Sequence, residues 1–260
     1  MSAFSPADDL AVALTLAAEA DLIAMDRYRA QDLGIQLKAD KSIVTDADTR
    51  VERLLREQLA GARPDDAVLG EEFGSEGEAR RTWIVDPIDG TSNFARGVPI
   101  WGSLIALTVD GAPVVGVVSA PALGRRWWGA VGLGAWVQHD GEEPRRLHVS
   151  AVDRLEDATL SYNNLQTWDQ YGYLDRLVAL SRAVGRTRAF GDLWSYMLLA
   201  EGAIDIAGEF DVKPWDIAAL VPIITEAGGR VTSATGSSRL DELSVVATNG
   251  VLHEAVLGHL

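Results

Sequence analysis

Six short apolar runs follow one another between residues 67 and 138, and glycine, proline or charged residues separate each run from the next. Runs of this length with turn residues at their ends are typical of β-strands. Because the runs come in a cluster and do not alternate strictly with helices, they predict a mostly antiparallel or mixed sheet. The six runs are 67–70, 82–86, 101–109, 113–120, 125–130 and 134–138.

Helices are predicted on both sides of this cluster. The first covers residues 5–28, where Ser5 is a favourable N-cap, Pro6 takes the first helical position and Asp8 is the capping-box partner. A second helix is predicted at 46–60. The second half of the chain adds strands at 158–163, 186–191 and 203–208 and helices at 173–184, 193–202, 215–228 and 250–260. The expected fold class is therefore α/β (α+β), with helices layered on sheets.

Composition limits the kind of protein that this chain forms. With 260 residues, 47% of them hydrophobic, and no linker or repeat, the chain predicts a single unit over 1–260, with approximate sub-domains 1–150 and 151–260. The formal charge of −15 disfavours nucleic acid as a partner, and no apolar run approaches the roughly 20 residues of a membrane span. The start of the chain lacks a basic leader and cysteine is absent, so we expect a cytoplasmic protein without a membrane partner.

The segment WIVDPIDGTSNFARG, residues 83–97, carries the first candidate chemistry. Asp86 ends a predicted buried strand, and Asp89 follows on a turn that Pro87 stiffens. Two carboxylates at such a turn repel each other unless a divalent cation lies between them, and ligands that are all oxygen suit magnesium. Gly90 and Thr91 then lead into a segment that opens a helix toward an anion. The alternative is that both aspartates serve only as turn residues.

Further acids stand at the ends of other predicted elements, where each alone is also explained as an N-cap or a solvated side chain. In chain order the candidates are Asp48, Glu71, Asp86, Asp89 and Asp216. This series resembles the signature of the inositol monophosphatase superfamily of magnesium-dependent phosphatases. The motifs that carry the resemblance are DKSIVTDAD (40–48), GEE (70–72), WIVDPIDGTSNF (83–94), PWDIAA (214–219), EAGGRVT (226–232) and ATNG (247–250).

The resemblance implies a fold and an activity. Members of the superfamily have a five-layer α/β/α/β/α sandwich and usually form homodimers. The longer stretches at 86–107, 117–130 and 188–209 are most similar to the bacterial histidinol-phosphatase branch, which removes phosphate from histidinol phosphate in histidine biosynthesis. The alternatives are a phosphatase of the same fold for inositol, sugar or nucleotide phosphates, and a regulatory role in binding other proteins.

The resemblance also implies a set of metal ligands for two to three Mg²⁺ ions per subunit. The first ion takes Glu71, Asp86 and the backbone carbonyl of Ile88. The second takes Asp86, Asp89 and Asp216. Asp48 matches the residue that helps to hold a third, weaker ion, whereas Asp46 lies off the matched position and is expected only to start a helix.

The catalytic roles follow from the same matched positions. Glu71 and Thr91 orient and deprotonate a water molecule that the cation has made more acidic, and this water attacks phosphorus in line with the ester oxygen. The backbone amides of Gly90 and Thr91 hold the phosphoryl oxygens. No covalent intermediate is required.

Substrate choice rests on Asp192 and Glu209, which match positions that complete the pocket in the superfamily. Histidinol phosphate carries an ammonium group and an imidazole, and both suit acidic partners. Asp192 is equally explained as the cap of the helix at 193–202. Arg188 is expected to pair with one of these acids or to touch the phosphate. The pair Trp127–Trp128 is expected to pack in the core, and the spaced glycines of GAVGLGAW (129–136) are interpreted as hairpin turns.

Overall fold

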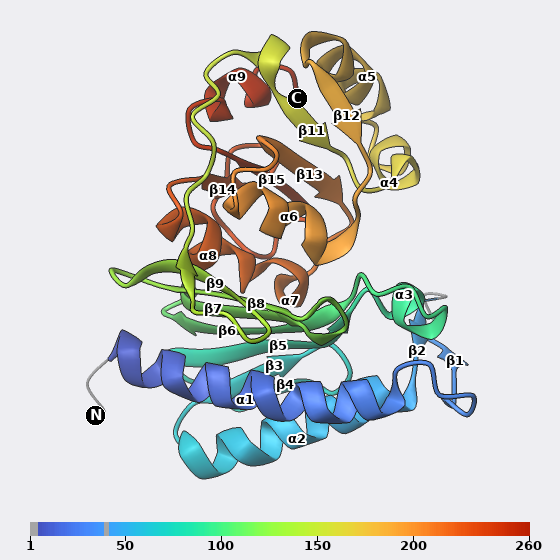
Figure 1. Cartoon of the computed structure of the whole chain (residues 1–260), viewed down its shortest axis with the longest axis vertical. Coiled ribbons are helices and arrows are strands. Elements are labelled where there is room, and N and C mark those ends of the chain that lie inside the picture. Colours follow the sequence, from blue (N-terminus) through green and yellow to red (C-terminus); the bar gives the residue numbers. More distant parts are fainter. Residues whose placement is uncertain (1–4, 39–41) are drawn as a thin grey trace.

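The computed structural model describes residues 5–38 and 42–260, so Asp40 and Lys41 of the first motif lie outside the described residues. Two long helices, α1 (Pro6–Arg27) and α2 (Asp46–Ala62), cover one face of the larger sheet (Figure 1). The amide of Asp8 donates to Ser5 Oγ at the start of α1, which confirms Ser5 as the predicted N-cap. At the start of α2, Thr45 is the N-cap and its own amide donates to the carboxylate of Asp48, which forms a capping box.

The larger sheet has eight strands in the order β10-β9-β8-β7-β6-β5-β3-β4. Only the pairing of β3 with β5 is parallel, and the others are antiparallel. All six predicted runs form strands of this sheet, which confirms the mixed, mostly antiparallel expectation. The strands are β3 (Ala67–Gly70), β4 (Gly74–Glu76), β5 (Arg81–Asp89), β6 (Gly102–Val109), β7 (Ala112–Ala120), β8 (Arg125–Ala130), β9 (Gly134–His139) and β10 (Arg145–Arg146).

The smaller sheet has five strands in the order β12-β11-β13-β15-β14. Their bounds are β11 (Thr159–Ser161), β12 (Arg186–Arg188), β13 (Ile206–Phe210), β14 (Arg230–Thr232) and β15 (Ser244–Thr248). The remaining short elements are β1 (Gln36–Leu37), β2 (Ile43–Val44), α3 (Thr91–Ala95) and the 3₁₀ turns η1 (Pro121–Leu123) and η2 (Leu155–Asp157).

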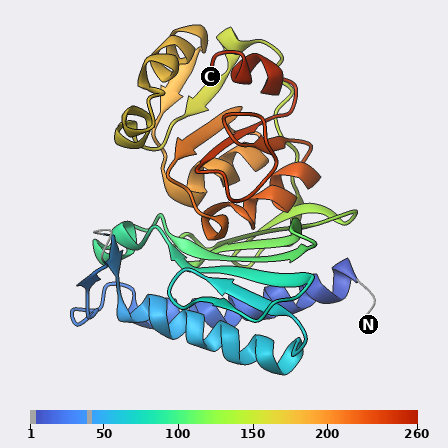
Figure 2. The ribbon, with the colours of Figure 1, turned by 180° about the vertical axis from the view of Figure 1, so that it is seen from behind.

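Helices lie between the two sheets, and further helices cover the outer face of the smaller one (Figures 1 and 2). The inner helices are α6 (Asp192–Ala200), α7 (Pro214–Ile217) and α8 (Leu220–Glu226), and the outer ones are α4 (Leu165–Gln170), α5 (Leu174–Ala183) and α9 (His253–Leu257). Three separate apolar cores lie between successive layers. The five-layer α/β/α/β/α sandwich is thus confirmed.

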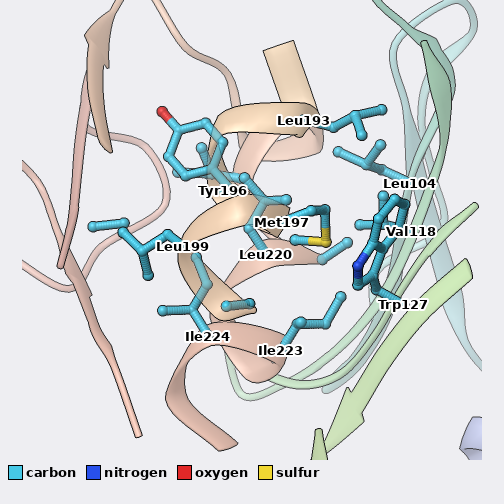
Figure 3. Close-up of a cluster of buried hydrophobic side chains, with 14 of the residues drawn as sticks. Leu104, Val118, Trp127, Leu193, Tyr196, Met197, Leu199, Leu220, Ile223 and Ile224 are labelled. Atoms are coloured by element: carbon cyan, nitrogen blue, oxygen red, sulfur yellow. The ribbon is translucent and has the colours of Figure 1, made fainter. Parts of the chain in front are cut away.

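The middle core fixes the two halves of the chain against each other. In Figure 3, Leu104, Val118 and Trp127 of the larger sheet face Met197 of α6 and Ile223 of α8. Trp127 is fully buried, so the expectation that it packs in the core is confirmed. The glycine-rich stretch after it forms the turn between β8 and β9, again as predicted. No helix in the described part of the chain is long and apolar enough to cross a bilayer.

Several elements differ from the prediction. The helix expected at 215–228 is two helices, α7 and α8, because Pro222 has no N–H to donate to the carbonyl oxygen of Ala218. Strands β14 and β15 and helix α4 were not predicted. All five residues of β15 are buried, but Ser244 and Thr248 at its ends are polar, so its apolar run is only three residues long and is too short to indicate a strand.

Candidate active site

Asp86 and Asp89 lie in strand β5, on either side of an irregularity in its pairing with β6. Asp86 pairs with Leu104 and Asp89 with Gly102, so three steps along β5 span two steps along β6. Residues three apart in a regular strand point to opposite faces, but the extra residue of a bulge lets two such side chains turn to the same side. Pro87 suits this position because it leaves no N–H unpaired in the ladder.

Asp216 of α7 completes an acidic cluster with these two residues. One carboxylate oxygen from each of Asp86, Asp89 and Asp216 lies within 4.8 Å of the other two. The sequence placed Asp216 more than 120 residues downstream, so only the packing of α7 against β5 brings it here.

Backbone amides hold these three carboxylates in place. The amide of Ile88 donates to Asp86 Oδ1 (3.0 Å), and the amide of Lys213 donates to Asp216 Oδ2 (2.6 Å). Asp89 Oδ2 accepts from the amide of Leu193 (2.7 Å), which lies at the start of α6 in the other half of the chain. Each carboxylate therefore keeps one oxygen for a further ligand while its orientation is fixed.

The electrostatics of the cluster favour a cation. Burial raises the pKa of Asp86, Asp89 and Asp216, and the charges of neighbouring acids raise each of them further. Deprotonated oxygens in such a place need a positive charge between them, and a set that contains only oxygen ligands fits a hard divalent ion. The donor set thus fits the predicted magnesium.

Glu71 approaches the cluster from the turn after β3. Its charge helps to raise the pKa of Asp86 and Asp216, but its carboxylate is not one of the three whose oxygens lie within 4.8 Å of one another. Its Oε1 accepts from Lys38 Nζ at 2.7 Å, and the same ammonium group donates to Glu72 Oε1 at 2.7 Å. A cation that binds Glu71 therefore competes with an ammonium group already present.

Thr91, the first residue of α3, contacts Asp48 of α2. The Thr91 hydroxyl lies 3.0 Å from Asp48 Oδ1 and 3.0 Å from the carbonyl oxygen of Ile88, and it donates to one of these acceptors at a time. Burial raises the pKa of Asp48. The structure thus brings Thr91 together with Asp48 and Ile88, while the partner of Glu71 is Lys38.

The turn itself requires glycine at position 90. Gly90 has φ of +82°, and a Cβ there would lie 3.0 Å from the carbonyl oxygen of Ile100. Gly90 is the N-cap of α3, the helix that the sequence predicted at this point. Asp192 packs against the same glycine and accepts from Asn93 Nδ2 of α3 (2.7 Å).

A cavity of about 250 Å³ opens beside Asp89 and Asp216. Asp192 and Glu209 line it too, so the structure brings both predicted specificity residues to the metal cluster. None of the lining residues that the structure describes is Lys, Arg or His. The full lining is Asp89, Asn164, Thr167, Asp192, Leu193, Tyr196, Glu209, Phe210, Asp211, Val212 and Asp216.

Arg188 does not join this cavity. Its side chain is exposed at the end of β12, and its guanidinium donates to the carbonyl oxygen of Thr187 (2.7 Å). Within residues 5–38 and 42–260 there is no ion pair between Arg188 and either Asp192 or Glu209.

Sequence reasoning missed the polar residues that hold the acids. Tyr196 donates from its hydroxyl to Glu209 Oε1 (2.6 Å), Asn93 holds Asp192, and Lys38 holds Glu71. Burial raises the pKa of Glu209 to about 7. Asn93 lies two residues after the DGT turn, inside the motif at 83–94, which was a signal that could have found it. Tyr196 occupies a position of an apolar helix that is typical of a core residue.

Comparison with known proteins gives a consistent result. The sequence model of the inositol monophosphatase family matches residues 6–260. Histidinol-phosphatase of Mycobacterium tuberculosis is 54% identical over 254 residues, 97% of this chain and 98% of that protein. Histidinol-phosphatase of Streptomyces coelicolor is 48% identical and covers 97% of each chain. The crystal structure of extragenic suppressor protein suhB from Bartonella henselae superposes with a TM-score of 0.87 at 29% identity, over 97% of this chain and 98% of that one.

These matches confirm the resemblance to the superfamily and to its histidinol-phosphatase branch that the motifs indicated. The family match covers both sheets and every acid of the candidate site. The chain belongs to the inositol monophosphatase family of phosphatases.

Proposed function

We propose that this phosphatase hydrolyses L-histidinol phosphate to L-histidinol and phosphate, with Mg²⁺ as its cofactor. The observation that carries the proposal is the acidic cavity beside the cluster of Asp86, Asp89 and Asp216. Two relatives that match nearly the whole chain bear the name histidinol-phosphatase and support the same assignment. A homodimer and a cytoplasmic location stay predictions.

Each acid in the cluster has a distinct proposed part. Glu71, Asp86, the Ile88 carbonyl, Asp89 and Asp216 would hold two Mg²⁺ ions, and Asp48 would help to hold a third. When bound, Mg²⁺ neutralises negative charge on the phosphoryl oxygens and lowers the pKa of the water molecules that it coordinates.

The protein's own groups then direct the proton and the phosphate. Glu71 accepts the proton of the attacking water, the role that its matched position in the superfamily implies, once its Oε1 is released from Lys38. Thr91 orients that water through its hydroxyl, which Asp48 and the Ile88 carbonyl hold in place. The amides at Gly90 and Thr91 bind phosphoryl oxygens at the start of α3.

The choice of substrate follows from the charges that remain. Asp89 and Asp216 would be neutralised by bound Mg²⁺, which leaves Asp192 and Glu209 as the partly buried acids of the cavity that would face the leaving group. An ammonium or imidazolium group offers both acids a charged hydrogen bond. An inositol phosphate offers only neutral hydroxyls, which compensate a buried carboxylate less well.

The direct test is phosphate release from histidinol phosphate and from inositol 1-phosphate, each with and without Mg²⁺. We expect turnover of histidinol phosphate to dominate and to require the metal. Faster turnover of inositol 1-phosphate would assign the protein to the inositol phosphatases of the same fold. Absence of phosphatase activity together with specific capture of a defined protein partner would support the regulatory alternative.

A sharper prediction concerns the two acids. Asp192→Asn and Glu209→Gln should each lower kcat/KM for histidinol phosphate by about ten- to a hundredfold, since a charged hydrogen bond contributes about 1.5–3 kcal/mol. The same variants should change turnover of para-nitrophenyl phosphate much less, because that substrate has no cationic group.

Asp211→Asn is the matched control for this prediction. Asp211 lines the same cavity, but its carboxylate is half-exposed and accepts from Lys213 and Tyr171. It should therefore have little influence on selectivity. An equal loss on both substrates in the Asp192 and Glu209 variants would show that these acids support the metal site instead of the leaving group.

A further inference from the structure

Glu52 is a fully buried carboxylate in the middle of α2, directly behind the turn that carries Glu71. Its Oε2 accepts from the amide of Glu72 (2.7 Å), and its Oε1 accepts from the amide of Phe73 (3.2 Å). The two backbone amides that follow Glu71 are thus bound to one side chain. A buried carboxylate is retained at such a place only when several donors satisfy it.

The backbone before Glu71 is also fitted to this carboxylate. A Cβ on Gly70 would lie 2.1 Å from Glu52 Oε1, so a side chain at position 70 would displace the carboxylate. Gly70 is the last residue of β3. Contacts with Glu52 therefore fix the chain on both sides of Glu71.

Arg56 extends the same support from the next turn of α2. Its Nε donates to Glu52 Oε1 (2.9 Å), and its Nη2 donates to the carbonyl oxygen of Gly74 (2.5 Å), the first residue of β4. Glu52 and Arg56 together bind the turn from residue 70 to residue 74 through its backbone. Glu52 and Arg56 are four residues apart, so they lie on the same face of α2. A helix holds such side chains more rigidly than a loop would.

We propose that Glu52 is a positioning residue for catalysis, which sets the place of the Glu71 carboxylate relative to Asp86 and the metal. This inference rests on the proposed role of Glu71. Supports of metal ligands change metal affinity or activity by about 10- to 100-fold when they are replaced. A shift of the catalytic base by about 1 Å lowers the rate of the reaction by a comparable factor.

Glu52→Gln tests the inference with little change in volume. Glutamine keeps one acceptor oxygen, but its NH₂ group faces a backbone N–H that needs an acceptor. One of the two hydrogen bonds from the backbone amides is therefore lost. We expect the Mg²⁺ concentration for half-maximal activity to rise about 10-fold and kcat at saturating Mg²⁺ to fall about 10-fold or more. KM for histidinol phosphate at saturating Mg²⁺ should stay within about twofold, because Glu52 does not line the substrate cavity.

Asp205→Asn is the matched structural control. Asp205 is 5% exposed and accepts from the amide of Thr159 (2.7 Å) and from Ser150, far from the turn at 70–74. The Asp205→Asn variant should have a lower melting temperature but an unchanged Mg²⁺ requirement. Arg56→Gln is a milder second variant at the same turn, and it should raise the Mg²⁺ requirement in the same direction if Glu52→Gln does not fold.

The outcomes separate this inference from the proposed function. If Glu71→Gln retains full activity, the role of Glu71 is wrong and the inference falls with it. If Glu71→Gln is inactive while folded Glu52→Gln and Arg56→Gln keep the wild-type Mg²⁺ requirement and kcat, only the positioning role is overturned. A melting temperature that falls in these two variants without any change in Mg²⁺ requirement or kcat overturns the positioning role as well.

Discussion

Replacing Glu71 by glutamine is expected to lower kcat for histidinol phosphate by about 10²- to 10⁴-fold while the fold survives. Glutamine keeps the size of the side chain and an oxygen that faces the metal, but it cannot accept the proton of the attacking water. The measurement is steady-state phosphate release at saturating Mg²⁺, with circular dichroism to confirm that the variant is folded.

Glu72→Gln is the control for the loss of charge at this turn. Glu72 shares the ammonium group of Lys38 with Glu71, and burial raises its pKa to about 7, but it is not among the proposed metal ligands. Its replacement should change kcat less than about tenfold. Similar losses in the two variants would mean that the paired charge matters and that the base lies elsewhere.

Removal of Mg²⁺ is the second change with a large expected effect. EDTA should abolish activity, and Mg²⁺ should restore it, because the cluster contains oxygen ligands and none of the proposed ligands is histidine. Calcium, which prefers more ligands and a looser geometry, should support little turnover. Full activity in metal-free buffer would contradict the proposed mechanism.

The stability of the metal-free protein should also fall as pH rises. Burial raises the pKa of Glu209 from 4.5 to about 7 and that of Asp216 from 3.8 to about 8. Groups with a raised folded-state pKa contribute stability below their unfolded pKa, near pH 4, and that contribution is lost as pH rises through 7 to 8. Each unit of pKa difference corresponds to about 1.4 kcal/mol.

Magnesium should reverse this loss, because a bound cation favours the charged carboxylates. We therefore expect the Mg²⁺-induced rise in melting temperature to be larger at pH 8 than at pH 6. Thermal melts with EDTA or with excess Mg²⁺ at both values provide the measurement. A rise that is equal at the two values, or larger at pH 6, would show that the buried acids are not the groups neutralised by the ion.

Local sequence determined the elements whose signals lie within a few residues. The run at 101–109 became β6 (Gly102–Val109), and the Ser5–Pro6 start became the first turn of α1. Binary patterning and capping chemistry act over one or two turns, so a single sequence carries them. Where the local signal is weak the element was missed: β15 has only three consecutive apolar residues, and its pairing with β13 and β14 places it in the smaller sheet.

The acids of the site were also recognisable from sequence, but through the resemblance of their motifs and not from any one spacing. Taken alone, each of Asp48, Glu71 and Asp216 is better explained as an N-cap or a solvated side chain than as a metal ligand. Asp48 has a capping role in the structure, because its carboxylate closes the capping box of α2, and it also accepts from Thr91, whereas its part in holding a metal stays a prediction. Capping and ligand binding use the same oxygen chemistry, so residue type does not separate them.

By itself, then, the sequence determined six of the eight strands of the larger sheet, the mixed pairing of that sheet, and which carboxylates are candidates for a metal. Only the tertiary structure decided which of them meet. The bulge at Pro87 turns Asp86 and Asp89 to one side, and the packing of α7 brings in Asp216. Lys38, Asn93 and Tyr196 hold the acids, and Glu52 holds the backbone after Glu71, through contacts that span from 13 to 99 residues. Such contacts depend on how the layers pack, and no local pattern encodes that.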